Sequence, residues 1–262
     1  MADKVKALVL GDLIGHSGMR ALFVTLHTLI KKYDADIVIL NGENADDGFG
    51  ITPDIANKLF AMGVDVITSG NHIWQKRAIF PLLEKDPRIL RPANYPKGVP
   101  GKGFSIVQKK GIKFGVLNLI GRVSLAQVDC PFSVAKKIIN EQKKNCDLFL
   151  VDFHAESVNE KEALAFFLDG EICALWGTHT HVQTADERIL PKGTAYMSDI
   201  GMIGPYYSVI GSDPQISIRR MMSQLPLKSQ VLDSEAIICG ASIEIDIKEK
   251  RATNIIPFAI KE

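Results

Sequence analysis

The amino-acid sequence predicts an α/β protein built on a parallel sheet with helices on both faces. Three short apolar runs, at residues 5–10, 37–40 and 64–68, are separated by segments with helical features. The runs hardly alternate between polar and apolar residues, which is typical of strands covered on both faces. Strand, helix, strand, helix, strand at this spacing favours parallel strands joined by right-handed crossovers.

The connections between these strands carry helix signals. Residues 19–33 have leucines at helical spacing and two lysines near the end, where they favour the helix dipole. Thr52 followed by Pro53 is typical of a helix start, and Gly63 of a helix end. Two helical crossovers are therefore expected between the first three strands.

The second half of the chain returns to the same pattern after a turn-rich connection. Residues 104–107 and 113–119 resemble a hairpin, and helices are expected at 131–145 and 157–167. Further strands are expected at residues 148–151, 172–176, 194–199, 236–247 and 253–256, with a Gly/Pro/Tyr loop at 201–211. We expect the terminal strands to be antiparallel and a second sheet to be layered on the first.

Composition limits the possible classes of protein. With 262 residues, 46% of them hydrophobic, the chain can bury a large core, and no linker divides it, so we expect a single domain over residues 1–262. A net charge of +1 without long runs of one sign argues against generic nucleic-acid binding. The four cysteines form no C-x-x-C pair and no window suggests a signal peptide or membrane span, so we expect a cytoplasmic protein without membrane contact.

Histidines gather where apolar runs end. Four of the six histidines, namely His72, His154, His179 and His181, follow such runs. If the strand geometry continues through Gly177-Thr178-His179-Thr180-His181, the last two histidine side chains point the same way and lie about 6 to 7 Å apart. Such a pair could serve two metal ions.

Ligand-type side chains follow five strands in total. The set is Asp12, Glu43, Asn44, Asn71, His72, His154, His179 and His181. In parallel sheets the working residues lie beyond the carboxyl ends of the strands. Oxygen and imidazole donors without thiolate suit two ions such as iron, manganese or zinc, which could hold a bridging hydroxide and clamp a phosphoryl group. Individually, these residues could instead be helix caps, turn residues or a core histidine.

The order of these motifs resembles the calcineurin-like metallophosphoesterase superfamily. The tracts NGEN, SGNHIW, DFHAE and GTHTHVQTADERILPKGTAYMSDIGM resemble the bacterial YmdB family of phosphodiesterases. The resemblance implies a four-layer α/β/β/α sandwich and a binuclear site, most often with iron. It also implies that the chain could form a homo-oligomer.

Carried over to this chain, the resemblance assigns the ligands of both metals. One ion would take Asp12, Glu43, Asn44 and His181, and the other Glu43, Asn71, His154 and His179. His72 would be the general acid that protonates the leaving oxygen. The chain departs from the superfamily because Ile14 replaces the first histidine and Glu43 replaces the bridging aspartate, which makes the first metal site richer in oxygen ligands.

The function that follows is hydrolysis of phosphodiesters, with cyclic nucleotides as the substrate class that the resemblance suggests. Attack by a metal-bridging hydroxide and proton donation by His72 form the expected mechanism. Two alternatives remain at this point: a regulatory protein that binds a nucleotide or partner and keeps structural metals, and a phosphomonoesterase on the same site. His16, Arg20 and Arg122 are weaker candidates for phosphate contacts.

Overall fold

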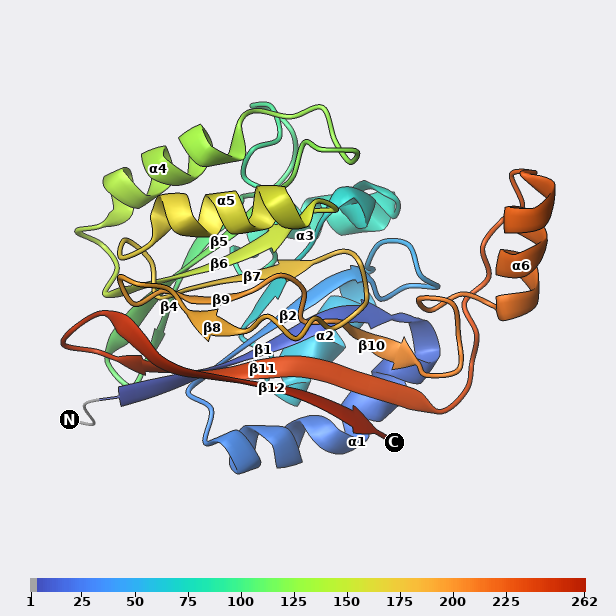
Figure 1. Cartoon of the computed structure of the whole chain (residues 1–262), viewed down its shortest axis with the longest axis horizontal. Coiled ribbons are helices and arrows are strands. Elements are labelled where there is room, and N and C mark those ends of the chain that lie inside the picture. The colour runs from blue at the N-terminus through green and yellow to red at the C-terminus, as the bar shows by residue number, and fades with distance from the viewer. Residues whose placement is uncertain (1–3) are drawn as a thin grey trace.

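The computed structural model describes residues 4–262 and contains two six-stranded sheets packed face to face. The first sheet has the strand order β12-β11-β10-β1-β2-β3, and the second has the order β4-β5-β6-β7-β9-β8. Helices cover the outer face of each sheet, as Figure 1 shows for α1 on the first sheet and for α4 and α5 on the second. The expected four-layer α/β/β/α sandwich is confirmed.

The first sheet consists of β1 (Lys4–Ile14), β2 (Ile37–Asn44), β3 (Val66–Thr68), β10 (Met202–Pro205), β11 (Ala236–Asp246) and β12 (Arg251–Lys261). The second consists of β4 (Phe104–Lys109), β5 (Ile112–Ile120), β6 (Leu148–His154), β7 (Ala174–Thr178), β8 (Arg188–Ile189) and β9 (Ala195–Met197). The helices are α1 (Gly15–Tyr33), α2 (Pro53–Met62), α3 (Phe80–Lys85), α4 (Pro131–Gln142), α5 (Val158–Leu168) and α6 (Pro214–Ser223), with short 3-10 turns η1 (Asn71–Trp74) and η2 (Arg77–Ile79).

The packing explains why the predicted strands are apolar on both faces. In β1, Val9 faces the layer between the two sheets, whereas Leu8 and Leu10 pack beneath the helices of the first sheet. In β6, Leu150 and Val151 divide in the same way between the middle layer and the second helical layer. Because both faces of each strand are buried, every position favours an apolar residue.

Most of the predicted helices and strands are present in the structure. The Thr52 hydroxyl caps α2, and Gly63 ends it in the left-handed conformation with φ of 108°. Strands β1, β2 and β3 are parallel, as are β5, β6, β7 and β9, while β4 and β5 form the expected hairpin. The terminal strands are antiparallel as expected, but they extend the first sheet.

Several boundaries differ from those expected. Strand β1 continues to Ile14 and α1 starts at Gly15, so Asp12 lies within the strand. Part of the expected loop at 201–211 is β10, which pairs with both β1 and β11. Helix α6 projects from the body in Figure 1 and was not expected from the sequence. Its Met221 and Met222 are exposed, so the helix lacks the buried apolar stripe whose spacing would predict it.

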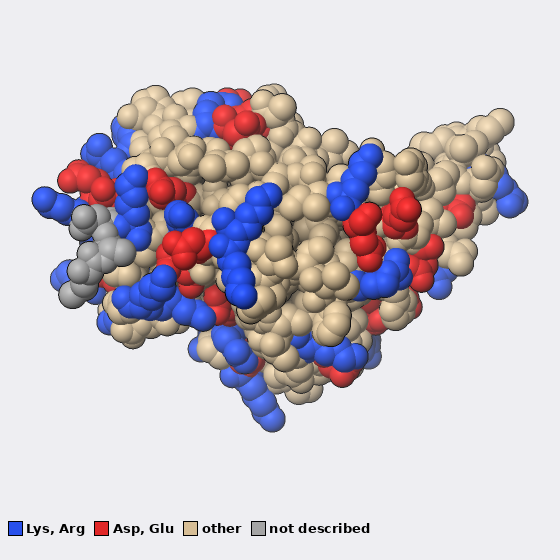
Figure 2. All heavy atoms as spheres, turned by 90° about the horizontal axis from the view of Figure 1, so that it is seen from below, with Lys and Arg blue, Asp and Glu red and all other residues tan. Residues whose placement is uncertain are grey.

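The surface carries charges of both signs. On the face shown in Figure 2, basic and acidic side chains are interspersed. No helix among residues 4–262 is both long and apolar enough to cross a membrane. His27 is exposed on α1, while Trp176 is buried in the core.

Candidate metal centre and active site

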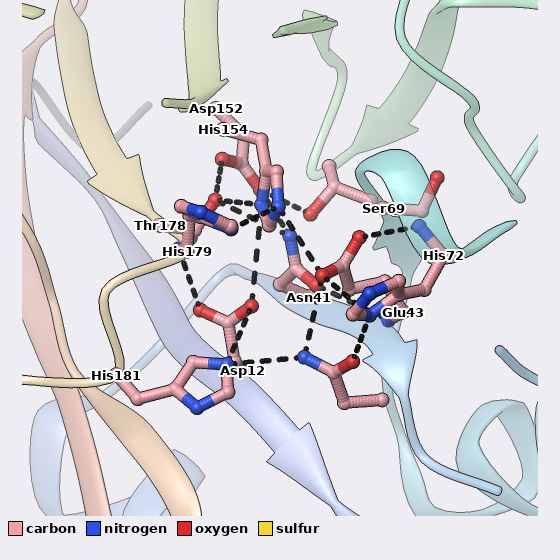
Figure 3. A network of polar contacts seen from close by, with 12 residues as sticks. Asp12, Asn41, Glu43, Ser69, His72, Asp152, His154, Thr178, His179 and His181 are labelled. Atoms are coloured by element: carbon pink, nitrogen blue, oxygen red, sulfur yellow. Dashed lines mark hydrogen bonds and ion pairs between the residues drawn. The ribbon is translucent and has the colours of Figure 1, made fainter. Parts of the chain in front are cut away.

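The predicted site residues converge where the carboxyl ends of strands from both sheets meet (Figure 3). The first sheet supplies Asp12 from β1, Glu43 and Asn44 from β2, and Asn71 and His72 from η1, which follows β3. The second sheet supplies His154 at the end of β6, and His179 and His181 after β7. The site therefore lies at the seam between the two sheets.

A local irregularity of β1 turns Asp12 into the site. The pairing of β1 with β2 shifts register on both sides of Asp12, and the Asp12 N–H donates to the Gly201 carbonyl at 3.0 Å. A Cβ on Gly11 would lie only 2.1 Å from that carbonyl oxygen, so glycine is required for this close approach. The Gly-Asp pair thus combines a steric requirement with a functional carboxylate.

The two neighbouring histidines reach the site by a different route from the one expected. Strand β7 ends at Thr178, and His179 and His181 have positive φ angles of 102° and 65°. The strand geometry that would set their spacing therefore does not apply to them. Such backbone angles cost about 1–3 kcal/mol each and are found where the surrounding structure holds them. Here Asp12 Oδ2 accepts the His179 N–H at 3.1 Å, and Asp199 Oδ2 accepts the Thr180 N–H at 3.0 Å.

Each of the three histidines donates one ring N–H outward, away from the centre of the site. His154 Nδ1 donates to Thr178 Oγ1 at 2.9 Å, since the Thr178 hydroxyl itself donates to Asp152. His179 Nε2 lies 3.2 Å from Glu156 Oε2, and His181 Nδ1 donates to the Ile210 carbonyl at 2.9 Å.

The other ring nitrogen of each histidine faces the shared centre. His154 Nε2 lies 3.1 Å from His179 Nδ1 and 3.2 Å from Glu43 Oε1. His181 Nε2 lies 3.8 Å from Asp12 Oδ1. An outward hydrogen bond with the second nitrogen turned inward is the usual arrangement of histidines that bind metals.

Two buried oxygens in the site have no hydrogen-bond partner among the described residues. They are Asp12 Oδ1 and Asn71 Oδ1. Buried polar atoms are nearly always paired, and a carboxylate or amide oxygen left alone costs free energy. Both atoms belong to residues predicted as metal ligands, so a cation would satisfy them.

Burial and charge act against each other in the site. Burial raises the pKa of Asp12 to about 7. Burial alone would also raise the pKa of Glu43, but the charge of His154 and a hydrogen bond from it lower that pKa to about 2. Burial alone would lower the pKa of His154, but Glu43 and Asp12 raise it to about 9. The buried carboxylates thus attract a positive charge, which a divalent cation would supply in place of the proton.

His72 and Asn44 form a separate pair at the edge of the site. An amide oxygen can only accept, so His72 Nδ1 donates to Asn44 Oδ1 at 2.7 Å. The amide nitrogen of Asn44 faces His181 Nε2 at 3.1 Å and Glu43 Oε1 at 3.3 Å. Ligation of an ion through Asn44 Oδ1 therefore requires this amide to turn over. Burial lowers the pKa of His72.

A metal-binding group can be recognised among these residues. Ligand atoms of Glu43, His154 and His179 lie within 4.8 Å of one another. Gly70 leaves room for them, because a Cβ there would lie 2.2 Å from His154 Cδ2 and 2.3 Å from Glu43 Oε2. The donor set is nitrogen and oxygen without thiolate, which fits a borderline ion such as iron, manganese or zinc.

Several supporting residues were not assigned a role from the sequence. Thr178 and Asp152 orient His154, Glu156 contacts His179, and Lys161 pairs with Asp199. Thr178 and Glu156 lie inside recognised tracts, but their roles depend on contacts between segments that are distant in sequence.

The weaker candidates lie outside this group of residues. His16 is exposed and lies 3.8 Å from Asp47. Arg20 donates to Asp233 and to the Ser234 carbonyl, and Arg122 contacts Glu160 through its backbone N–H. These contacts give none of the three a position among the metal-ligand candidates.

The chain is similar to known proteins along nearly its whole length. A family model described as YmdB-like protein matches residues 8–258. The 2′,3′-cyclic-nucleotide 2′-phosphodiesterase of Bacillus subtilis (strain 168) is 43% identical over 258 residues, covering 98% of each chain. Crystal structures of a hypothetical protein from Thermus thermophilus and of a novel phosphatase from Mycoplasma pneumoniae are also similar.

The first of these structures has a TM-score of 0.92 at 36% identity, covering 98% of this chain and 100% of the other. The second has a TM-score of 0.94 at 35% identity, covering 100% of this chain and 95% of the other. With the fold and the converging ligand-type residues, these matches show that the chain belongs to the YmdB-like family of phosphodiesterases within the calcineurin-like metallophosphoesterase superfamily.

Proposed function

We propose that this chain hydrolyses 2′,3′-cyclic nucleotides at a binuclear metal centre, cleaving the bond to the 2′ oxygen. The observation that carries the proposal is the arrangement of His154, His179 and His181, each of which donates one ring N–H outward and turns its other nitrogen inward. The substrate class is suggested by the Bacillus subtilis relative.

The proposed ligands fall into two groups that share Glu43. One ion would be held by Asp12, Glu43, Asn44 and His181, and the other by Glu43, Asn71, His154 and His179. Iron is the first candidate, with manganese or zinc as alternatives. When bound, the two ions would activate water and neutralise charge on the phosphoryl oxygens.

The protein's own side chains orient the reaction. Thr178 and Glu156 fix the tautomers of His154 and His179. Asn44 Oδ1 accepts from His72 Nδ1 in this structure, and if the amide turns over to ligate the ion, its N–H would face His72 Nδ1 instead, so Asn44 can orient the ring in either arrangement. The other His72 nitrogen is then available to donate a proton to the leaving oxygen. A phosphodiester anion beside the ring favours the protonated imidazole that this role requires.

Metal content and turnover test the proposal together. We expect plasma mass spectrometry to find about two ions per chain, as a bridged pair requires. Phosphorus NMR should show conversion of 2′,3′-cyclic AMP to the 3′-phosphate, with activity lost on chelation and restored by iron or manganese. Glu43→Gln should remove activity, whereas Glu84→Gln on α3 serves as a control. Cyclic nucleotide binding without turnover would contradict the proposal and favour a regulatory role.

A further inference from the structure

A large pocket lies beside the candidate metal centre. Its volume is about 760 Å³, within the range typical of sites for organic ligands. It is lined by Asp47, Phe49, Gln75, Lys76, Lys228, Ser229, Gln230 and Val231. These residues come from the loop between β2 and α2, from the segment after η1, and from the segment between α6 and β11.

The pocket is adjacent to the proposed general acid. The ring of Phe49 contacts the His72 imidazole edge-on, with centroids 5.0 Å apart and an interplanar angle of 65°. Phe49 therefore borders both His72 and the pocket. A group bound in the pocket would lie on the side of the metal centre where His72 can reach it.

The wall formed by residues 228–231 is tied to the site. The Gln230 carbonyl accepts the Asp213 N–H at 2.8 Å, and the Leu232 N–H donates to the Gly211 carbonyl at 3.2 Å. Ile210 precedes Gly211, and its carbonyl accepts the ring Nδ1–H of His181. The segment 210–213 thus contacts both this wall of the pocket and His181, one of the proposed metal ligands.

This wall approaches the opposite side of the pocket closely. A Cβ on Gly48 would lie 2.5 Å from Val231 Cγ2, and a Cβ on Gly15 would lie 2.9 Å from Val231 Cγ1. Both glycines have positive φ, so the close packing depends on their lack of a side chain. Val231 therefore packs directly against the loop between β2 and α2, which forms the facing wall of the pocket.

From this geometry we infer that the pocket is the subsite for the nucleoside of the substrate. The inference rests on the proposed function. In a cyclic phosphodiester of a ribose, the leaving oxygen remains attached to the same nucleoside. Water adds to phosphorus, the bond from phosphorus to the 2′ oxygen breaks, that oxygen takes a proton from His72, and the proton lost by water passes to solvent. The nucleoside must consequently lie on the His72 side.

The lining residues suit such a group. Phe49 offers an aromatic surface to a base, and the side chains of Gln75 and Gln230 can both donate and accept hydrogen bonds at its edges. Lys76 is paired with Asp46 at 2.7 Å, and the other two charged lining residues, Asp47 and Lys228, have opposite signs. An uncharged, polar and aromatic group fits this lining better than a second phosphate.

A filling substitution tests the subsite. Gln230→Trp places a bulky side chain in the pocket, and Glu235→Trp is a matched control on the same connection, exposed and outside the lining. The substrates are 2′,3′-cyclic AMP and the cyclic phosphate of ethylene glycol, which has the same five-membered ring without a nucleoside. We expect Gln230→Trp to raise KM for the nucleotide about tenfold at similar kcat, and to leave the small substrate unchanged. The control should change neither.

Binding of adenosine, measured by calorimetry, tests the pocket without turnover. Weaker binding to Gln230→Trp than to the wild type and the control would support the subsite, even if neither cyclic phosphate is hydrolysed and the proposed function fails. Equal effects of Gln230→Trp on both substrates, or unchanged adenosine binding, would overturn the inference.

Discussion

The ammonium nitrogen of Lys161 lies 3.0 Å from Asp199 Oδ2, and neither side chain is more than 1% exposed. The same carboxylate accepts the backbone N–H groups of Thr180 and Gly201 at 3.0 and 2.9 Å. The ion pair thus joins α5 to the loop that carries both terminal histidines of the site. It also supports the turn whose carbonyl accepts the Asp12 N–H.

Removal of one partner of this pair should destabilise the fold. We expect Lys161→Met to lower the free energy of unfolding by about 3–5 kcal/mol, because it leaves the Asp199 carboxylate buried without a counter-charge. Adding Asp199→Asn should recover part of the loss, since an amide oxygen can still accept backbone N–H groups. Urea unfolding of the single and double variants measures the effect. A double variant no more stable than Lys161→Met would contradict this account.

The Thr178 hydroxyl should control metal affinity through His154. Thr178→Val keeps the shape of the side chain but removes the acceptor for the His154 Nδ1–H. We expect metal affinity to fall about 10–100-fold, the usual cost of losing a partner behind a ligand. Competition with a chelator measures this. Thr180→Val is the matched control, because the Thr180 hydroxyl makes no hydrogen bond within residues 4–262. Equal losses in the two variants would refute the prediction.

Gly70→Ala should impair the site while the chain still folds. The φ of Gly70 is −143°, outside the left-handed region, so the effect of the change should come mainly from the added Cβ. The added Cβ would collide with His154 and with the Glu43 carboxylate. We expect metal content and phosphodiesterase activity to fall together with little change in far-ultraviolet circular dichroism. Full metal loading and activity in the variant would show that the site has more room than the structure indicates.

His72→Ala should affect substrates according to their leaving groups. An alkyl phosphodiester needs a proton on the departing oxygen, whereas an activated aryl phosphodiester hardly does. We expect kcat to fall about 10²- to 10⁴-fold for the alkyl ester and much less for the aryl ester. Steady-state kinetics on both esters, with the exposed His27→Ala as control, provides the test. Equal losses on the two esters would exclude His72 as the general acid.

Much of the fold follows from residue patterns that burial produces directly. The apolar runs of β1, β2, β6 and β7 become strands because both of their faces are covered. The polar residues that follow those runs mark the carboxyl ends of the strands, which is why the sequence alone indicates Asp12, Glu43 and His154 as candidate ligands. A caps-and-turns interpretation of Asp12 is wrong, since that residue lies inside β1.

Other features depend on contacts that a local pattern does not contain. The positive φ angles of His179 and His181 are held by Asp12 and Asp199, which are distant in the chain, so strand periodicity gave the wrong geometry. Strand β10 is short and becomes a strand by pairing between β1 and β11. The orientation of the Asn44 amide likewise follows from His72 and His181, which the sequence places far apart.

The seam position of the site divides its donors between the two sheets. The carboxylates and amides come from the first sheet, and Asp12 and Glu43 face imidazoles that come from the second. Cations held at the proposed positions would act as crosslinks across the sandwich, because their ligands come together only when the two sheets are packed against each other. Ion binding and folding are then linked, so the loaded protein should resist heat better than the chelated one. The atoms that perform the chemistry would also fasten the two halves of the molecule together.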